Sequence, residues 1–421
     1  MSREEAGVAD RWCTAQEAAA ELGVTLATLY AYASRGLLHS EAVPGEPRAR
    51  RYPREDVERL KGRKELRREP ERAVPKALHW GPTPVLESAI TLIEGGRLFY
   101  RGRDAIDLAR RGSVEEVAAL LWTGDPGEAA GLFAGKPPEL PAGAAALLKK
   151  VKKVNLAPVE RCQVVLPLAG AEDLAAWDLR PRSVAATGAR LLRLLARVLA
   201  GGPGTGGIAE ILQRGWAPGR PEAAGSIAAA LILAADHELN VSAFTARCVA
   251  SAGASPYDVV TAGLAALKGA RHGGHTRRME AVFREAGSAA GARQAVADRL
   301  RRGEEIPGTG HALYPDGDPR GKALLALALE AAPGSPAVAL AEELAQAFRE
   351  LLGDHPNLDF GLVALARALD LPPDTPLALF ALGRTIGWIG HAIEEYAQDR
   401  LIRPRAAYVG DPPVDAQASA G

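Results

Sequence analysis

Beyond about residue 85, apolar and alanine residues recur at the three- and four-residue spacing of packed helices through most of the chain. The spacing is clearest in ARLLRLLARVLAG (189–201), SIAAALILAADHELNVSAFTARCVASAG (226–253) and GKALLALALEAA (321–332). Alanine favours helices and lets them approach closely. We therefore expect a mainly α, multi-helix body in which DHEL (236–239) lies within a long helix. Near residues 88–101, an alternating apolar stretch with a Gly-Gly turn predicts one minor hairpin.

The composition indicates an ordinary globular protein of the cytoplasm. The 421 residues are 47% hydrophobic, which fits two or three domains, and 51 basic side chains balance 51 acidic ones. The cysteines, Cys13, Cys162 and Cys248, are far apart, so neither a disulfide framework nor a zinc site is predicted. The start lacks the apolar stretch of a signal peptide, and the longest apolar run (227–235) is about half a membrane span. We expect no membrane contact.

The first 75 residues predict a separate small domain. Thr14 and Glu17 have the spacing of a capping box at the start of one helix, which Gly23 ends. A second helix is expected in VTLATLYAYASRG (24–36), and a hairpin-like stretch and third helix in residues 37–60. Helix, tight turn and helix form a helix-turn-helix pattern. Residues 61–84 are charged and then proline-rich, which predicts a short helical extension followed by a linker.

This arrangement resembles the winged helix-turn-helix of MerR and excisionase-type DNA-binding domains, whose wings carry arginines. Between residues 48 and 68, ten basic residues face four acidic ones, a local charge that suits phosphate contacts. The open alternative is a charged three-helix bundle that contacts proteins. The candidate DNA-binding residues are Thr25, Thr28 and Tyr32, as groove-facing positions, and Arg48, Arg50 and Arg51 in the wing.

In the helical body, three histidines and one aspartate stand out by their local settings. His237 lies in DHEL, His272 precedes the pliable Gly273–Gly274 pair, His311 follows a Pro/Gly loop, and Asp359 lies between a proline and a helix. A metal site is one alternative, because His272 is three residues from another histidine. No H-E-x-x-H motif or third close ligand follows, however, so no metal is predicted.

Taken together, these segments resemble the citrate synthase family over about residues 83–410. The resemblance rests on SAITLIEGG, LFYRGRDAIDLA, DHELNVSAFTARCVAS, LKGARHGG, IPGTGHALYPDGDPR, PNLDF and DRLIRPRAAYVG, in this order. It implies a two-domain helical enzyme that condenses acetyl-CoA with oxaloacetate and hydrolyses the thioester to citrate and CoA. No tightly bound cofactor is expected, since the acyl-CoA is a co-substrate.

The resemblance also implies residue roles. His272 would donate a hydrogen bond to the thioester oxygen, His311 would polarise the oxaloacetate ketone, and Asp359 would remove a methyl proton. An oxaloacetate-binding role falls to His237, Arg320, Arg384 and Arg403, the last supplied by the other subunit of a homodimer. The implied layout is a large domain of residues 83–272 plus 372–421 and a small domain of residues 273–371 that closes over the ketoacid.

The chain departs from the family's pattern on the acyl and coenzyme A side. The family commonly has Ala-Asn at His275–Thr276, an aromatic residue at Thr309, and basic residues around Ala312 and Pro315. After Asp359–Phe360 it usually has a Ser-Gly pair, where this chain reads GLVALARAL. Two alternatives therefore stay open: a 2-methylcitrate synthase that uses propionyl-CoA, and a DNA-binding regulator whose synthase-like domain senses a metabolite.

Overall fold

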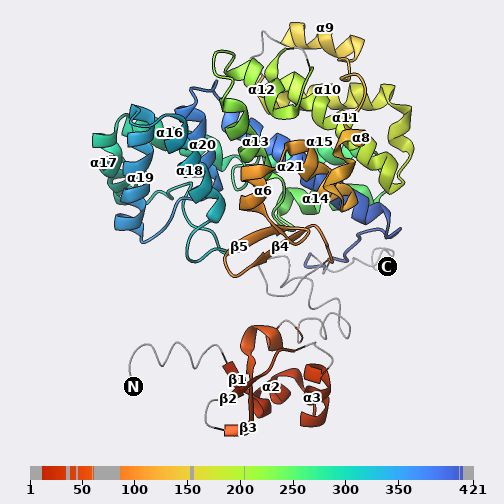
Figure 1. The fold of residues 1–421 in the computed structure, drawn as a ribbon, viewed down its shortest axis with the longest axis vertical. Coiled ribbons are helices and arrows are strands. Elements are labelled where there is room, and N and C mark those ends of the chain that lie inside the picture. Colours follow the sequence, from red (N-terminus) through yellow and green to blue (C-terminus); the bar gives the residue numbers. More distant parts are fainter. Residues whose placement is uncertain are drawn as a thin grey trace, which may run out of the picture. The chain divides into compact units, whose positions relative to one another are not determined.

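The fold is described from a computed structural model of the chain (Figure 1). The structure describes residues 12–34, 38–43, 46–58, 60, 86–151, 156–202, 204–406 and 408–410. Contacts divide the chain into two units, one of residues 1–87 with 403–421 and one of residues 88–402. The expected extension and linker at residues 61–84 lie outside the described residues. Within residues 88–402, the expected division into a large and a small domain stays a prediction.

The first unit contains the helix-turn-helix and wing that the sequence predicts. Its helices are α2 (Ala15–Leu22) and α3 (Leu26–Ser34), and residues 54–58 are again helical. Both capping-box hydrogen bonds between Thr14 and Glu17 are present, and Gly23 ends α2 in the left-handed conformation at φ +60°. The strands β1 (Trp12–Thr14), β2 (Glu41–Val43) and β3 (Glu46–Pro53) form an antiparallel sheet in the order β1-β3-β2.

The second unit begins with the hairpin expected near residues 88–101. Strands β4 (Thr91–Glu94) and β5 (Arg97–Tyr100) pair antiparallel, with Thr91 opposite Tyr100, and β6 (Arg103–Asp104) adds a short third strand. Gly95 and Gly96 form the turn with φ of +58° and +71°, a region that side chains with a Cβ rarely occupy.

Helices make up the rest of this unit, as the alanine-rich spacing predicts. They are α6 (Ala105–Arg111), α7 (Val114–Thr123), α8 (Ala129–Leu132), α9 (Ala142–Val151), α10 (Pro158–Glu172), α11 (Pro181–Ala200), α12 (Ile208–Trp216), α13 (Ala223–Ala234), α14 (Val241–Ser251), α15 (Pro256–Leu267), α16 (His275–Ala286), α17 (Ala292–Arg301), α18 (Pro319–Ala331), α19 (Pro336–Leu352), α20 (Leu358–Ala368) and α21 (Thr375–Tyr396). Short 3-10 turns occupy Pro126–Glu128, Leu174–Trp177 and Ala289–Gly291. In the described part of the chain, no helix is both long and apolar enough to cross a bilayer.

Helix α21 is buried along nearly its whole length and packs against α11, α13, α14 and α15 (Figure 1). Two of its glycines admit the end of α13 at very short range. A Cβ on Gly383 would lie 2.5 Å from the Leu231 carbonyl oxygen, and one on Gly387 would lie 2.5 Å from the Ala235 carbonyl oxygen. The Gly387 N–H also donates to Ala235 O at 3.0 Å. Any side chain at these two positions would push α13 away from α21.

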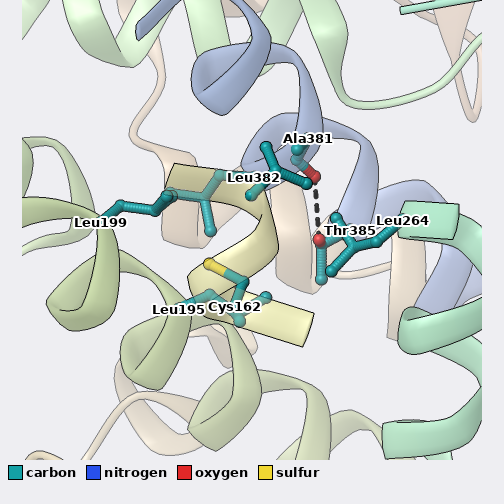
Figure 2. A pocket seen from close by; sticks show the side chains of 8 residues that line it. Cys162, Leu195, Leu199, Leu264, Ala381, Leu382 and Thr385 are labelled. Carbon is teal, nitrogen blue, oxygen red and sulfur yellow. Dashed lines mark hydrogen bonds between the residues drawn. The ribbon is translucent and has the colours of Figure 1, made fainter. Parts of the chain in front are cut away.

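The centre of the unit is close-packed and apolar. Figure 2 shows side chains from α10, α11, α15 and α21 around a cavity of about 10 Å³, which is the size of a single water. Cys162 faces this cavity, and burial raises the pKa of its thiol to about 12. The thiol therefore stays protonated at neutral pH and acts as a small apolar group.

Candidate active site

His237 lies in a turn between two helices, so the prediction that DHEL lies within a long helix is wrong. Helix α13 ends at Ala234, Glu238 has a φ of +50°, and Asn240 caps the start of α14. The Asn240 side chain accepts the N–H groups of Ser242 and Ala243, which satisfies the free donors of the new helix. The apolar spacing on both sides is helical, and only the capping asparagine marks the break between them.

The rings of His237, His311 and Tyr314 lie against one another. The ring centroids of His237 and His311 lie 4.8 Å apart, edge to face, and those of His311 and Tyr314 lie 5.1 Å apart. His237 Nε2 lies 3.0 Å from the Tyr314 hydroxyl. The Leu313 N–H donates to His311 Nδ1 at 3.2 Å, so this nitrogen is an acceptor and the ring proton lies on Nε2.

Two buried arginines lie close to these histidines. Arg320 donates Nε–H and Nη2–H to the Asp318 carboxylate at 2.9 and 2.8 Å, a bidentate pair that uses two of its three nitrogens. Arg384 donates Nε–H to Ala234 O at 2.8 Å. Burial lowers the pKa of Arg384 to about 10, and the positive charge of Arg320 contributes to that shift. The site therefore holds two neighbouring buried cations, which suits a ligand with two negative charges.

His272 lies in a tight turn between α15 and α16. A Cβ on Gly274 would lie 2.6 Å from the Gly269 carbonyl oxygen, so a glycine is required for the turn to fold back on itself. His272 Nε2 lies 2.8 Å from the Ser242 hydroxyl, which also accepts the Trp388 indole N–H at 3.2 Å. The ring packs edge-on against Phe380, with centroids 5.8 Å apart. Residues of α14 and α21 thus hold the imidazole of His272, although His272 itself belongs to a turn.

Asp359 lies in the first turn of α20, directly beside the loop that carries His311. The Asn357 side chain caps α20 and also donates Nδ2–H to Gly310 O at 3.1 Å, while Gly310 N–H donates to His355 O at 2.9 Å. Gly310 has a φ of +62°, and a Cβ there would lie 2.4 Å from the Asp354 carboxylate. These bonds couple the position of His311 to that of Asp359.

The carboxyl group of Asp359 is unusual among the titratable groups of the site. Its Oδ1 is shielded from solvent and has no hydrogen-bond partner among the described residues. Burial raises the pKa of Asp359 to about 7, against the opposing charges of Arg320 and Arg384. A carboxylate with this pKa, and with one oxygen that accepts no hydrogen bond from the described residues, can take a proton from a ligand at neutral pH.

The histidines around it are neutral in the same pH range. Burial, with the charge of Arg384, lowers the pKa of His272 to about 3, and burial, with the charge of Arg320, lowers that of His311 to about 4. Burial also lowers the pKa of His237 well below its ordinary value. Each imidazole can therefore donate one N–H to a ligand without carrying a charge.

A family model described as "Citrate synthase, C-terminal domain" matches residues 80–405. The chain belongs to the citrate synthase family. It is 30% identical to the citrate synthase of Haloferax volcanii over 79% of this chain and 95% of that one. It is 31% identical to the 2-methylcitrate synthase of Mycobacterium tuberculosis over 74% of this chain and 84% of that one.

The fold agrees with this family assignment. The structure matches that of the citrate synthase from Thermoplasma acidophilum in ternary complex with carboxymethyl coenzyme A and oxaloacetate, at a TM-score of 0.68 and 26% identity. The match covers 79% of this chain and 95% of that one. A second family model, "MerR HTH family regulatory protein", matches residues 13–69, which confirms the helix-turn-helix predicted for the first unit.

The structure brings together six of the seven candidate residues of this citrate synthase family member. The seventh, Arg403, is an exposed residue of the first unit, and its role stays a prediction. Sequence reasoning missed the side chains that hold the others in place. Asp318 could have been suspected from its capping position before Pro319, and Tyr314 from its place three residues after His311. Further supporting side chains are Ser242 and Trp388.

In the helix-turn-helix unit, the wing arginines already have partners. Arg50 Nη1 donates to the Ser40 hydroxyl at 2.6 Å, and Arg51 pairs with Glu41 at 3.1 Å and lies 4.4 Å above the Trp12 ring. Arg48 belongs to β3, but its side chain lies outside the described part of the chain. In the helices, the Thr25 hydroxyl accepts the N–H of Thr28, and the partly buried Tyr32 packs against the core.

Proposed function

We propose that this enzyme condenses acetyl-CoA with oxaloacetate and hydrolyses the resulting thioester to citrate and CoA. The observation that carries the proposal is Asp359, a carboxyl group with a vacant, shielded oxygen and a pKa of about 7. Neutral histidines and two buried arginines lie in the same site. The named ligands of the Thermoplasma acidophilum complex, oxaloacetate and a coenzyme A derivative, support the same pair of substrates.

The first step is removal of a proton from the acetyl methyl group by Asp359. A thioester α-carbon is a very weak acid, so the electron pair must be stabilised on the thioester oxygen as the proton leaves. His272 donates a hydrogen bond to that oxygen, and a neutral donor of this kind stabilises the developing enolate without surrendering a proton first. Asp359 then holds the proton that the substrate has lost.

Donation by His272 requires its ring proton on Nδ1, and Ser242 can arrange this. The Ser242 hydroxyl has one proton and two acceptors at 2.8 Å, Asn240 Oδ1 and His272 Nε2. Asn240 Oδ1 already accepts two backbone N–H groups at the start of α14. When the hydroxyl turns to His272 Nε2, the ring proton moves to Nδ1 and faces the substrate.

The second substrate is a ketone with two carboxylates. Arg320 and Arg384 provide the positive charge for the carboxylates, since each keeps terminal nitrogens outside the bonds that fix it. His237 adds a hydrogen bond beside them.

His311 polarises the ketone oxygen through its Nε2–H while the enolate carbon attacks the ketone carbon. The electron pair of the C=O π bond moves to that oxygen, which takes the Nε2 proton. His311 then regains a proton from solvent, and Asp359 releases the one that it took. Water then cleaves the thioester and releases CoA. Closure of residues 273–371 over the site would exclude other water during condensation.

The acyl donor is tested by kinetics with the purified enzyme. We expect thiol release to require oxaloacetate and to be at least about 10-fold more efficient, in kcat/KM, with acetyl-CoA than with propionyl-CoA, the discrimination that one methylene typically gives. A preference for propionyl-CoA would instead make this a 2-methylcitrate synthase, as in the Mycobacterium tuberculosis relative. Oxaloacetate binding without thiol release from either donor would support a metabolite-sensing regulator.

We further propose a homodimer in which Arg403 enters the partner's site. Mixing inactive Arg403→Ala subunits with inactive His311→Ala subunits should restore part of the activity, because one of the two sites in a hybrid dimer would then contain both native residues. Subunit exchange is followed by native mass spectrometry of differently tagged chains. Exchange without any recovery of activity would contradict a shared site.

We propose that residues 1–75, which contain the helix-turn-helix, bind DNA and are dispensable for chemistry. Replacing Arg48, Arg50 and Arg51 by alanine should weaken binding to duplex DNA and reduce the slope of log K against log salt by about 0.9 for each lost phosphate contact. Turnover should stay unchanged, because none of the proposed active-site residues lies within residues 1–75. Binding is measured by fluorescence anisotropy over a series of salt concentrations.

The control is alanine at Arg110 and Arg111, two exposed arginines of α6 in the second unit, because it removes positive charge outside the wing. A chain without residues 1–75 should fold and keep its turnover. Absence of DNA binding at low salt would instead indicate a protein-contact or regulatory domain. For the whole chain we infer a cytoplasmic location, which the unpaired Cys13, Cys162 and Cys248 support.

A further inference from the structure

A row of buried charges lies behind His237, and the proposed reaction does not use it. It starts at Asp236, next to His237, and continues through His391 and Glu394 on α21 to Arg247 on α14. His391 Nε2 lies 3.2 Å from Asp236 Oδ1, and His391 Nδ1 lies 3.5 Å from Glu394 Oε2. Glu394 Oε2 lies 3.3 Å from Arg247 Nη1. The side chains of Asp236, His391 and Arg247 are completely buried.

Both carboxylates of this row are also tied to the chain around β4. Thr91 donates its hydroxyl to Asp236 Oδ2 at 2.6 Å, and Ala89 N–H donates to Glu394 Oε1 at 2.7 Å. On α21, a Cβ at Gly387 would lie 2.4 Å from Asp236 Oδ1, so only glycine admits the carboxylate there. Asp236 is thus held against α21 one residue before the proposed oxaloacetate ligand.

The charges of this cluster require a second cation. Asp236, Glu394 and Glu395 supply three carboxylates, and Arg247 pairs with the two glutamates at 3.3 and 2.8 Å. Buried charge is costly unless it is paired, and His391 is the titratable group placed between Asp236 and Glu394. Burial acts to lower the pKa of His391, but these two carboxylates outweigh it and raise the pKa to about 9.

We propose that His391, as an imidazolium, is a positioning residue that fixes the Asp236–His237 turn against α21 and thereby sets the affinity for oxaloacetate. This inference rests on the proposed function, because oxaloacetate is the ligand assigned to His237. A neutral side chain at position 391 would leave Asp236 facing Glu394 with no cation between them. The turn would then move away from α21, and His237 would move with it.

The test is a double-mutant cycle on the full-length enzyme. His391→Gln should raise the KM for oxaloacetate about 10-fold, with kcat within about threefold and the KM for acyl-CoA unchanged, as for coupling through a buried network. Adding Asp236→Asn should recover most of this loss, because two amides can form a neutral hydrogen-bonded pair. Wild-type turnover in the same assay tests the proposed function, and the ratios between variants test His391.

The pH dependence gives an independent readout. The groups that face His391 are Asp236 and Glu394, with Arg247 and Glu395 behind them and Arg384 acting on Asp236. The pKa of His391 is raised, so the imidazolium is present below about pH 9 and is lost above it. In the wild type, kcat/KM for oxaloacetate should therefore fall above about pH 9. In His391→Gln the fall should begin about one pH unit higher, where Arg384, with a pKa of about 10, loses its charge.

An unchanged KM for oxaloacetate in folded His391→Gln would overturn the proposal, and so would a double variant no better than the single one. Folding is checked by circular dichroism and thermal unfolding. If His391→Gln does not fold, Thr91→Val provides the test, because it removes one donor to Asp236 without adding volume. It should raise the KM for oxaloacetate about threefold, and an unchanged KM would again overturn the proposal.

Discussion

Replacing Asp359 by asparagine is expected to lower kcat by about 10³-fold, within the range that a general base contributes. The amide keeps the shape of the side chain but cannot take a proton from the acetyl group. The fold should not suffer, because Oδ1 of Asp359 has no hydrogen-bond partner among the described residues. The measurement is thiol release at saturating oxaloacetate and acetyl-CoA.

The pH profile separates loss of the base from misplacement of substrate. The pKa of Asp359 is raised to about 7, so the active carboxylate is present above this pH and is lost as the pH falls through it. Wild-type kcat/KM should fall on the acid side of about pH 7, and the residual activity of Asp359→Asn should lack this fall. Asp370→Asn, an exposed change just beyond α20, is the control. Wild-type turnover in Asp359→Asn would show that another group is the base.

Replacing His272 by glutamine should lower kcat by about 10²- to 10³-fold, the usual effect of losing one donor to a developing oxyanion. The KM for oxaloacetate should change little, since the oxaloacetate ligands are on other elements. Stopped-flow kinetics with acetyl-CoA and its deuterated methyl form provide the measurement. The isotope effect should grow in the variant, because proton removal becomes the slowest step.

His275→Gln is a matched control for this change, since His275 lies three residues further along and begins α16. Ser242→Ala provides a second comparison: it leaves the imidazole in place but removes the hydroxyl that can set its tautomer. A kcat for His272→Gln within a factor of two of the wild type would remove His272 from the reaction.

Much of the site could be predicted from short segments. His272 and His311 each lie beside a glycine, and Asp359 follows Pro356 by three residues; such turn and break residues are visible in the sequence. The turn around His237 has no such marker. It is bounded by Asn240, a capping residue, and by Glu238 in the left-handed conformation, so apolar spacing on both sides concealed it.

The supporting contacts could not be predicted, because they join residues that are distant in the sequence. Trp388 reaches Ser242 across 146 positions, and Arg384 reaches Ala234 across 150. Local spacing carries no information on which helix will lie against which other helix. The same holds for charge: burial, and not the residue type, raises the pKa of Asp359 and lowers that of His272.

Four residues of helix α21 contact the elements that surround the two proposed substrate positions: Arg384, Gly387, Trp388 and His391. These residues occupy positions i, i+3, i+4 and i+7 and therefore share one face of the helix. Inserting or deleting a single residue between Arg384 and His391 would rotate one end against the other by about 100°. Such a change would break the link between the two substrate positions even if every side chain were kept. A one-residue length change in this helix is therefore expected to damage the site far more than the same change in a surface loop.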